Sequence, residues 1–317
     1  IAVYSALLTP GDTVLGMSLS HGGHLTHGHP VTWMAKLFSF VRYGTTADGQ
    51  IDYDEIRSLA REKKPKLLLV GYSAYSREIE YQTVKAIADE VGALTMADIA
   101  HPAGLIAAGE MRNPVPIFDV VTTTTHKTLR GPRGGMILCK AAFAKTIDKA
   151  VFPGFQGGPH QHNIAAKAVA FGEALLPQFK EYARQVIANA KALCAALEKG
   201  GLAIQFGGTE NHLILADVTP FGLTGREAQE LLDRVHITLN KNMIPNDPRK
   251  PMDPSGIRLG TPALTTRGMG IPEMEMIGEI IVRCLRHPHD HNALDDARTA
   301  VRDLTKRFPL YPGLSYL

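Results

Sequence analysis

Short apolar segments alternate with longer amphipathic segments through the first half of the chain. The apolar segments are rich in aliphatic and β-branched residues and are bounded by turn residues, which is typical of strands. They predict strands at residues 13–17, 37–43, 66–72, 93–99, 120–124 and 136–139. Amphipathic segments predict helices at residues 53–64 and 82–91. Strands joined by helices form a mainly parallel sheet with helices on both faces, so the predicted fold class is α/β.

The pattern changes in the second half of the chain. Residues 160–199 form one long helical pattern, in which Pro177 predicts a break or kink. Thr224 and Glu227 have the spacing of a capping box at the start of a helix. The remaining pattern predicts strands at 202–206, 212–218 and 237–239 and helices at 224–235, 273–285 and 292–308. We therefore predict a large α/β domain at residues 1–175 and a smaller α+β domain at residues 176–317, bridged by the long helix.

Composition narrows the class of protein. Apolar residues make up 44% of the 317 residues and charged residues 21%, which is ordinary for a globular protein. The net charge of +3 is too small to indicate nucleic acid or a membrane surface as a partner. No apolar window is long enough to span a bilayer. The three cysteines form no CxxC motif and indicate reduced thiols, so we expect a cytoplasmic protein.

One lysine follows a strand-like, threonine-rich segment. Residues 120–125 are β-branched, His126 and Lys127 come next, and a Gly/Pro-rich turn begins soon afterwards. A buried amine loses its charge through desolvation, and a neutral lysine can attack a carbonyl to form a Schiff base. For a lone lysine, a solvated side chain at a polar strand end is the commoner interpretation.

Two other polar side chains follow predicted strands. Asp98 ends the strand at residues 93–99, and Ser73 follows the strand at residues 66–72. In open α/β sheets, ligands bind beyond the carboxyl ends of the strands. A strand-end aspartate alone is more often a cap or turn residue. Pyridoxal phosphate is held by this kind of arrangement, in which a lysine such as Lys127 and an aspartate lie at two strand ends. The carboxylate then keeps the ring nitrogen protonated.

Four histidines lie within residues 21–29, separated by glycines. Such a cluster could bind zinc, but it contains no cysteine or acidic ligand. The glycines suit a loop that lies against a flat ligand, so we favour a histidine stacked on an aromatic cofactor and predict no metal.

Two further motifs suit anionic groups. The Gly-rich segment 152–159 precedes a helix, where free backbone N–H groups can bind an anion, although a tight interdomain turn is equally consistent. Arg258 follows Ser255 and Gly256 and could hold a substrate carboxylate with two hydrogen bonds. The alternative for Arg258 is an ordinary surface arginine.

Together these motifs resemble those of serine hydroxymethyltransferase, a fold-type I pyridoxal phosphate enzyme. The resemblance extends through essentially the whole chain. It rests on motifs in the same order at residues 21–28, 73–76, 98–101, 120–127, 131–135, 156–159, 240–242 and 255–258. It implies the fold-type I architecture and a role for each matching position.

Around the cofactor, the resemblance implies that Lys127 forms the internal aldimine, that Asp98 pairs with the pyridine nitrogen and that His24 stacks on the ring. The other implied cofactor contacts are Ser73 and His101 near the phenolic oxygen, His126 and a partner subunit's Gly158 at the phosphate, and Thr124 and Arg133 in the lysine pocket. The implied catalytic groups are Lys127, Asp98, His101, Thr124 and His126.

The resemblance also implies the substrate sites. Arg258 would hold the carboxylate of serine or glycine. The implied folate site is lined by Leu19, Gly23, Leu25 and Asn242. A site that takes Gly158 from a neighbouring subunit implies at least a homodimer. Phe155 and Arg130 each replace a small residue of the commoner bacterial pattern. These replacements narrow the surroundings of the cofactor or change their charge.

The implied activity is the interconversion of serine and tetrahydrofolate with glycine and 5,10-methylenetetrahydrofolate, a reaction of one-carbon metabolism and amino-acid biosynthesis. One alternative is an aldolase of the same fold that works without folate. A second alternative, of another class, is a catalytically inactive relative kept as a scaffold.

The chain opens at Ile1, and residues 2–8 have the pattern of the end of an amphipathic helix. We therefore expect the sequence to be N-terminally incomplete. In the resembling family, a serine-rich phosphate loop immediately precedes this segment. Since that loop would supply backbone N–H groups to the phosphate, we expect pyridoxal phosphate to be absent from a crystal in which the chain begins at Ile1.

Overall fold

The computed structural model describes residues 1–311, which fall into two compact units. The first unit comprises Ile1–Ser73 and Glu78–Ala183, and the second comprises Ala74–Arg77 and the residues from Arg184 onward. The two units therefore meet along the chain inside helix α8 (Pro177–Lys199). The domain boundary between residues 175 and 176 stays a prediction. The last six residues of the predicted second domain, 312–317, lie outside the described part of the chain.

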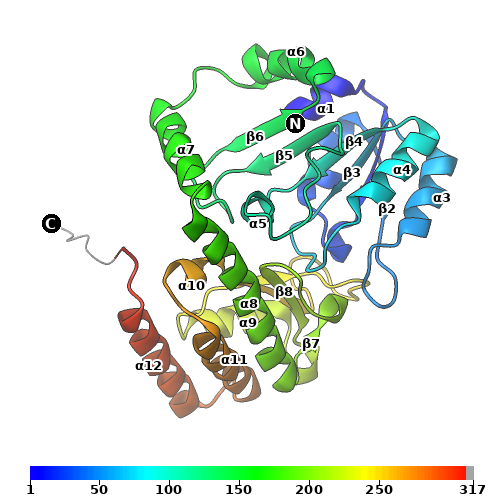
Figure 1. The fold of residues 1–317 in the computed structure, drawn as a ribbon. Helices are drawn as coiled ribbons and strands as arrows, with labels where there is room; N and C mark the ends of the chain where they lie inside the picture. Colours follow the sequence, from blue (N-terminus) through cyan, green and yellow to red (C-terminus); the bar gives the residue numbers. More distant parts are fainter. Residues whose placement is uncertain (312–317) are drawn as a thin grey trace. The chain divides into compact units, whose positions relative to one another are not determined.

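The first unit contains a six-stranded, mainly parallel sheet (Figure 1). Its strands, in spatial order, are β2 (Ser39–Tyr43), β1 (Thr13–Met17), β3 (Leu67–Gly71), β4 (Leu94–Asp98), β5 (Val120–Thr124) and β6 (Gly135–Cys139). The first five strands are parallel and β6 is antiparallel to β5. The predicted α/β fold with a mainly parallel sheet is confirmed.

Helices cover this sheet on both faces. The helices of the first unit are α1 (Ala2–Leu7), α2 (Met34–Leu37), α3 (Tyr53–Lys63), α4 (Tyr81–Val91), α5 (Ala103–Ala107), α6 (Ala141–Lys149) and α7 (Gln161–Ala174). Leu67 and Leu69 pack with Val3 of α1 and Ile147 of α6 in one core cluster. Leu68 points to the other face because side chains alternate along a strand, and it is also fully buried. Figure 1 shows α3 and α4 side by side, and both contact strands of the sheet.

The second unit is built on a four-stranded antiparallel sheet. Its strands, in spatial order, are β7 (Ala203–Ile204), β8 (Leu213–Asp217), β10 (Gly256–Gly260) and β9 (Asn240–Asn242). Its helices, besides α8, are α9 (Gly225–Asp233), α10 (Pro262–Thr266), α11 (Ile271–Arg286) and α12 (His291–Arg307). Ile257 and Leu259 of β10 pack with Leu193 of α8 and Ile281 of α11 in a single core. Figure 1 shows α11 and α12 side by side.

Of three local predictions in the second half of the chain, two are confirmed and one is wrong. The capping box is confirmed, because Thr224 Oγ1 accepts the Glu227 N–H at 3.1 Å and Glu227 Oε2 accepts the Thr224 N–H at 2.8 Å. The break is also confirmed, since α7 ends at Ala174 and α8 begins at Pro177. The strand predicted at 237–239 is wrong. Leu239 is buried in the core, but the hydrogen-bonded ladder with β10 starts only at Asn240. The apolar pattern at residues 237–239 therefore reflects side-chain packing and not strand pairing.

Candidate active site

Asp98 lies at the carboxyl end of β4, at the edge of the sheet where parallel strands end together. Its neighbour across the ladder is Gly71 at the end of β3. Gly71 has a φ of +138°, and a Cβ there would lie 2.3 Å from the backbone oxygen of Asp98. Only glycine fits this position. The close approach of the two strand ends therefore fixes where the Asp98 carboxylate stands.

The Asp98 carboxylate is held by His27, a residue that the sequence did not single out within its histidine cluster. His27 is only 2% exposed, and its Nε2 lies 3.1 Å from Asp98 Oδ2. His27 Nδ1 accepts the backbone N–H of His24 at 3.3 Å. Because Nδ1 acts as the acceptor, Nε2 carries the hydrogen in the neutral ring and donates it to Asp98.

These contacts set the charge state of Asp98. Burial alone would raise the pKa of the carboxyl, but the hydrogen bonds from His27 and from the Ala100 N–H, at 3.1 Å, outweigh it and hold the pKa below its ordinary value. The carboxylate is thus ionised at neutral pH, although its side chain is only 20% exposed. No sequence signal distinguishes His27 from its three neighbouring histidines, since its burial depends on how the loop packs.

The histidine loop consists of two short 3-10 turns, η1 (Leu19–His21) and η2 (Leu25–His27). Ser73 fastens it to the end of β3, because its N–H donates to Gly22 O and its Oγ donates to Gly23 O, both at 2.8 Å. The rings of His24 and His27 lie 5.6 Å apart. The structure therefore brings Ser73, Gly23, His24 and Asp98 together. The stacking role of His24 stays a prediction.

Lys127 lies in a tight loop after β5, which is the neighbour of β4. The Arg130 N–H donates to Lys127 O at 2.9 Å, and the Gly131 N–H donates to Thr125 O at 2.8 Å. The same loop is tied to the segment that follows Asp98. Thr128 Oγ1 donates to His101 O at 2.6 Å, and Thr124 Oγ1 donates to Ala100 O at 3.2 Å. Lys127, Thr124 and His101 are therefore gathered at the edge where Asp98 stands.

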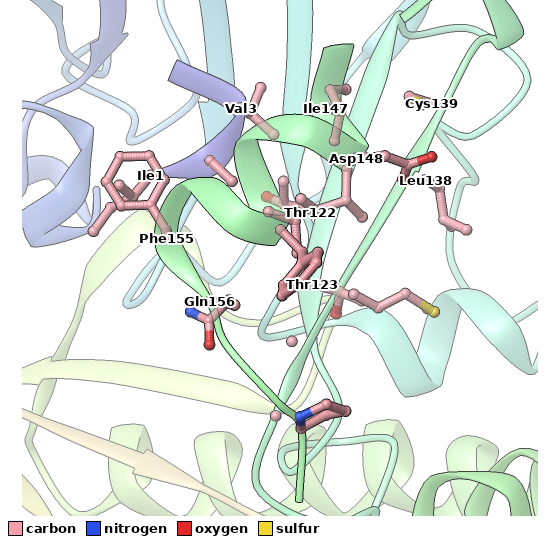
Figure 2. A pocket seen from close by; sticks show the side chains of 18 of the residues that line it. Ile1, Val3, Thr122, Thr123, Leu138, Cys139, Ile147, Asp148, Phe155 and Gln156 are labelled. Atoms are coloured by element: carbon pink, nitrogen blue, oxygen red, sulfur yellow. The ribbon is translucent and has the colours of Figure 1, made fainter. Parts of the chain in front are cut away.

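The remaining predicted cofactor contacts, His126, Arg133 and Gly158, are less tightly enclosed. His126 Nδ1 accepts the Gly134 N–H at 3.4 Å. Arg133 and Gly158 line an open hollow of the first unit that also reaches His27 and Asp98. Gly158 is exposed, and a Cβ built there would meet nothing within 4 Å. Figure 2 shows this hollow, with Thr122 and Thr123 of β5, Leu138 of β6 and Phe155 around it.

The structure assigns a contact to Arg130, one of the two residues that depart from the commoner pattern. Its guanidinium carbon lies 3.9 Å from the ring centroid of Tyr182 and 5.4 Å from that of Phe179, both in the first turns of α8. Tyr182 also donates a hydrogen bond to Thr128 O at 3.4 Å. The positive charge of Arg130 is therefore directed onto aromatic faces of α8.

The second unit carries the predicted carboxylate site. Arg258 lies in the middle of β10 and donates from Nη2 to Asn240 Oδ1 at 3.1 Å. Burial lowers the pKa of its guanidinium. Asn242, from the predicted folate site, lies on the neighbouring strand β9, whereas Leu19, Gly23 and Leu25 belong to the histidine loop of the first unit.

Residues 1–311 contain neither a candidate metal site nor a candidate membrane-spanning helix. Within this range, no group of three or more His, Cys, Asp or Glu side chains could hold a metal ion. None of the helices described there is long and apolar enough to cross a membrane.

The fold and the site together define a class of protein. A mainly parallel sheet with a lysine and an ionised carboxylate at adjacent strand ends is the arrangement in which fold-type I enzymes hold pyridoxal phosphate. A sequence model of the family described as serine hydroxymethyltransferase matches residues 1–281.

Two curated relatives agree. A serine hydroxymethyltransferase of Synechococcus sp. (strain JA-3-3Ab) is 56% identical over 99% of this chain and 75% of its own length. Another, from Rippkaea orientalis (strain PCC 8801 / RF-1), is 57% identical over 99% of this chain and 74% of its own length. The chain belongs to the serine hydroxymethyltransferase family and is a pyridoxal-phosphate-dependent transferase that interconverts serine and glycine.

Proposed function

We propose that Lys127 binds pyridoxal phosphate covalently and that the hydroxymethyl group of serine passes to tetrahydrofolate, giving glycine and 5,10-methylenetetrahydrofolate. The observation that carries this proposal is the ionised Asp98 carboxylate, held by His27 at the same sheet edge as Lys127. A buried carboxylate that stays ionised suits the protonated ring nitrogen of the cofactor, so the residues present fit the group.

Bound pyridoxal phosphate would supply an electron sink for the pair released when the Cα–Cβ bond of serine breaks. Asp98 would hold the proton on the ring nitrogen, which preserves that sink. Lys127 would hold the cofactor aldehyde, and its amine would move a proton near the reacting carbon. His24 would lie against the ring face. Arg258 would orient the substrate through its carboxylate.

The other assignments extend the same site. Ser73 and His101 would lie near the phenolic oxygen, His126 and Gly158 would bind the phosphate, and Thr124 and Arg133 would shape the lysine pocket. Folate would bind against Leu19, Gly23, Leu25 and Asn242. The motif match supports these residues. Hydrogen bonds further support the placement of Ser73, which is tied to the histidine loop, and of Thr124 and the loop after Lys127, which are tied to the segment that follows Asp98.

We further propose a homodimer at least, with Gly158 contributed to the partner's site. The segment around Gly158 supports this, because several apolar side chains there are exposed: Phe152, Phe155, Ile164, Val169 and Leu175. Such side chains on one segment are typical of a protein–protein interface. A cytoplasmic location is proposed because the three cysteines are free thiols, two of them buried. Nucleic acid and membranes are not expected as partners.

The test is a reconstitution with pyridoxal phosphate, serine and tetrahydrofolate, followed by measurement of glycine and methylenetetrahydrofolate. Both products should form in equal amounts, and only when folate is present. Cleavage of a β-hydroxy amino acid with no folate requirement would identify an aldolase of the same fold. The absence of both turnover and a visible-edge absorbance band would identify an inactive relative.

A further inference from the structure

Arg258 has a cross-strand partner that the proposed function does not use. Strands β9 and β10 are antiparallel, and their register places Asn240 directly opposite Arg258. Directly opposed side chains lie on the same face of a sheet. Arg258 Nη2 donates to Asn240 Oδ1 at 3.1 Å. The adjacent residues Ile257 and Leu259 point to the other face and are buried in the core of the second unit.

The backbone around this pair is fixed from both sides. On β9, the Lys241 N–H donates to Gln229 Oε1 of α9 at 2.8 Å. At the start of β10, Asp247 accepts the Ser255 N–H at 2.9 Å and the Ser255 hydroxyl at 2.7 Å. The two strands therefore cannot slide past each other without breaking side-chain hydrogen bonds, and the register that opposes Asn240 to Arg258 is well determined.

The chemical nature of Asn240 decides what the contact can do. Its amide oxygen accepts one of the five N–H donors of a guanidinium but carries no net charge. A carboxylate at the same place would accept the same donor and also neutralise the arginine. A substrate carboxylate binds arginine best when two parallel N–H groups and the full positive charge are available. Asn240 thus orients the guanidinium without neutralising its charge.

We propose that Asn240 is a positioning and specificity residue: it presents Arg258 to the α-carboxylate of the amino acid substrate with the charge intact. This inference rests on the proposed role of Arg258 as the carboxylate site. It predicts selectivity for ligands that carry a free carboxylate over the corresponding amides.

The test compares Asn240→Asp with Asn240→Ala. Asp should compete with the substrate for Arg258 and raise the KM for serine by about tenfold or more, since a hydrogen bond between charged groups is stronger than one to a neutral amide. Ala should raise it only about two- to fivefold, because Arg258 keeps its charge and loses only its orientation. In both variants kcat should fall much less than KM rises. The affinity for pyridoxal phosphate, measured without substrate, should stay at the wild-type value.

A second readout measures binding without turnover. Glycine and glycinamide are titrated into the cofactor-loaded protein, and Asn240→Asp should weaken glycine binding far more than glycinamide binding. The matched control is Asn292→Asp, which adds the same charge at an exposed position on α12 of the same unit. It should leave both affinities unchanged. Thermal melting of each variant confirms that the protein is folded.

Arg258→Ala distinguishes a failure of the role of Asn240 from a failure of the proposed carboxylate site. If Arg258→Ala weakens serine binding while Asn240→Asp binds serine and glycine like wild type, the role of Asn240 is overturned and the proposed function stands. If Arg258→Ala leaves serine binding unchanged, the carboxylate site itself is wrong, and the role of Asn240 is overturned with it. Equal weakening of glycine and glycinamide by Asn240→Asp would also overturn the inference, since charge competition requires a difference.

Discussion

The Asp98 edge of the sheet and the segment from η3 (Ala150–Phe155) into α7 differ in how their side chains are held. At the Asp98 edge, contacts within the chain hold the polar groups: His27 and Ala100 hold the carboxylate, and Ser73 holds the histidine loop. In the η3–α7 segment, Phe155 is 51% exposed and Ile164 46% exposed.

This difference indicates which part of the site a single chain completes. The Asp98 carboxylate, which would act on the ring of the cofactor, is positioned by contacts within the chain, which lowers the cost of organising it during the reaction. Gly158, one of the two residues proposed to meet the phosphate, lies on a segment with exposed apolar side chains, and a Cβ built there would meet nothing within 4 Å. We therefore expect substitutions at the Asp98 edge to change chemistry, and substitutions in the η3–α7 segment to change assembly.

The largest effect is expected for Asp98→Asn. The amide is close in shape but cannot keep the ring nitrogen protonated, so the electron sink is weakened. A lost charge pair of about 2–4 kcal/mol corresponds to a decrease in kcat of roughly 30- to 900-fold. Pyridoxal phosphate should still bind and give its absorbance band. A kcat within a few fold of wild type would show that Asp98 does not contact the ring nitrogen.

Replacing His27 tests whether the edge is organised by its own contacts. His27→Phe removes the donor to Asp98 and should lower kcat by about ten- to a hundredfold, given roughly 1.5–3 kcal/mol for a hydrogen bond to a charged group. His27→Gln, which keeps a donor, should recover part of the loss. The matched control is His29→Phe in the same loop, since the hydrogen bond described for His29 Nδ1 is with the Val31 N–H. Equal losses in all three variants would indicate a general disturbance of the loop.

The same substitution has a pH signature. The pKa of Asp98 is depressed in the folded protein, so its contribution to stability is present above the unfolded pKa and is lost as the pH falls through the folded pKa. His27→Phe removes the hydrogen bond that opposes burial, so the folded pKa rises. The difference in unfolding free energy between wild type and His27→Phe should therefore be largest at neutral pH and shrink below about pH 4. Urea unfolding at several pH values measures it, and a constant difference would contradict the account.

Ile164→Asp tests the η3–α7 segment. A charge on this exposed apolar face should weaken subunit association by about tenfold or more, because burying an apolar side chain of this size contributes roughly 1.5–3 kcal/mol. Sedimentation at several concentrations measures the change. Met252→Asp, at a 75% exposed position in the second unit, is the control. If Ile164→Asp associates as wild type does, this segment does not form the interface.

The smallest effect is expected for Arg130→Ala. Loss of the stacking contact on Tyr182 should lower the free energy of unfolding by about 0.5–1 kcal/mol, the usual value for an exposed cation–π contact. Arg130 also has a φ of +58°, so Arg130→Gly relieves backbone strain that Arg130→Ala retains. The glycine variant should therefore be as stable as the alanine variant or more so. A less stable glycine variant would show that strain at this turn is negligible.

The sequence predicted the first unit well because each of its strands buries a strong apolar segment, as Leu67–Gly71 does at every position. It also placed Asp98 and Lys127 at one edge, since that follows from the parallel order of the strands. It misplaced the strand at residues 237–239, because side-chain burial and backbone pairing separate there. His27 and Asn240 were not found. Their roles depend on a tautomer fixed by one backbone N–H and on a cross-strand register, and neither leaves a local pattern.

The most direct test of the central claim is to map the lysine that binds pyridoxal phosphate. The protein is loaded with the cofactor, reduced with borohydride, digested and analysed by mass spectrometry. We predict a single pyridoxyl modification on the peptide that contains Lys127. The modification should be absent in Lys127→Ala, which should still fold because Lys127 is only half-buried at a loop. A stoichiometric modification at another lysine, with Lys127 unmodified, would contradict the account.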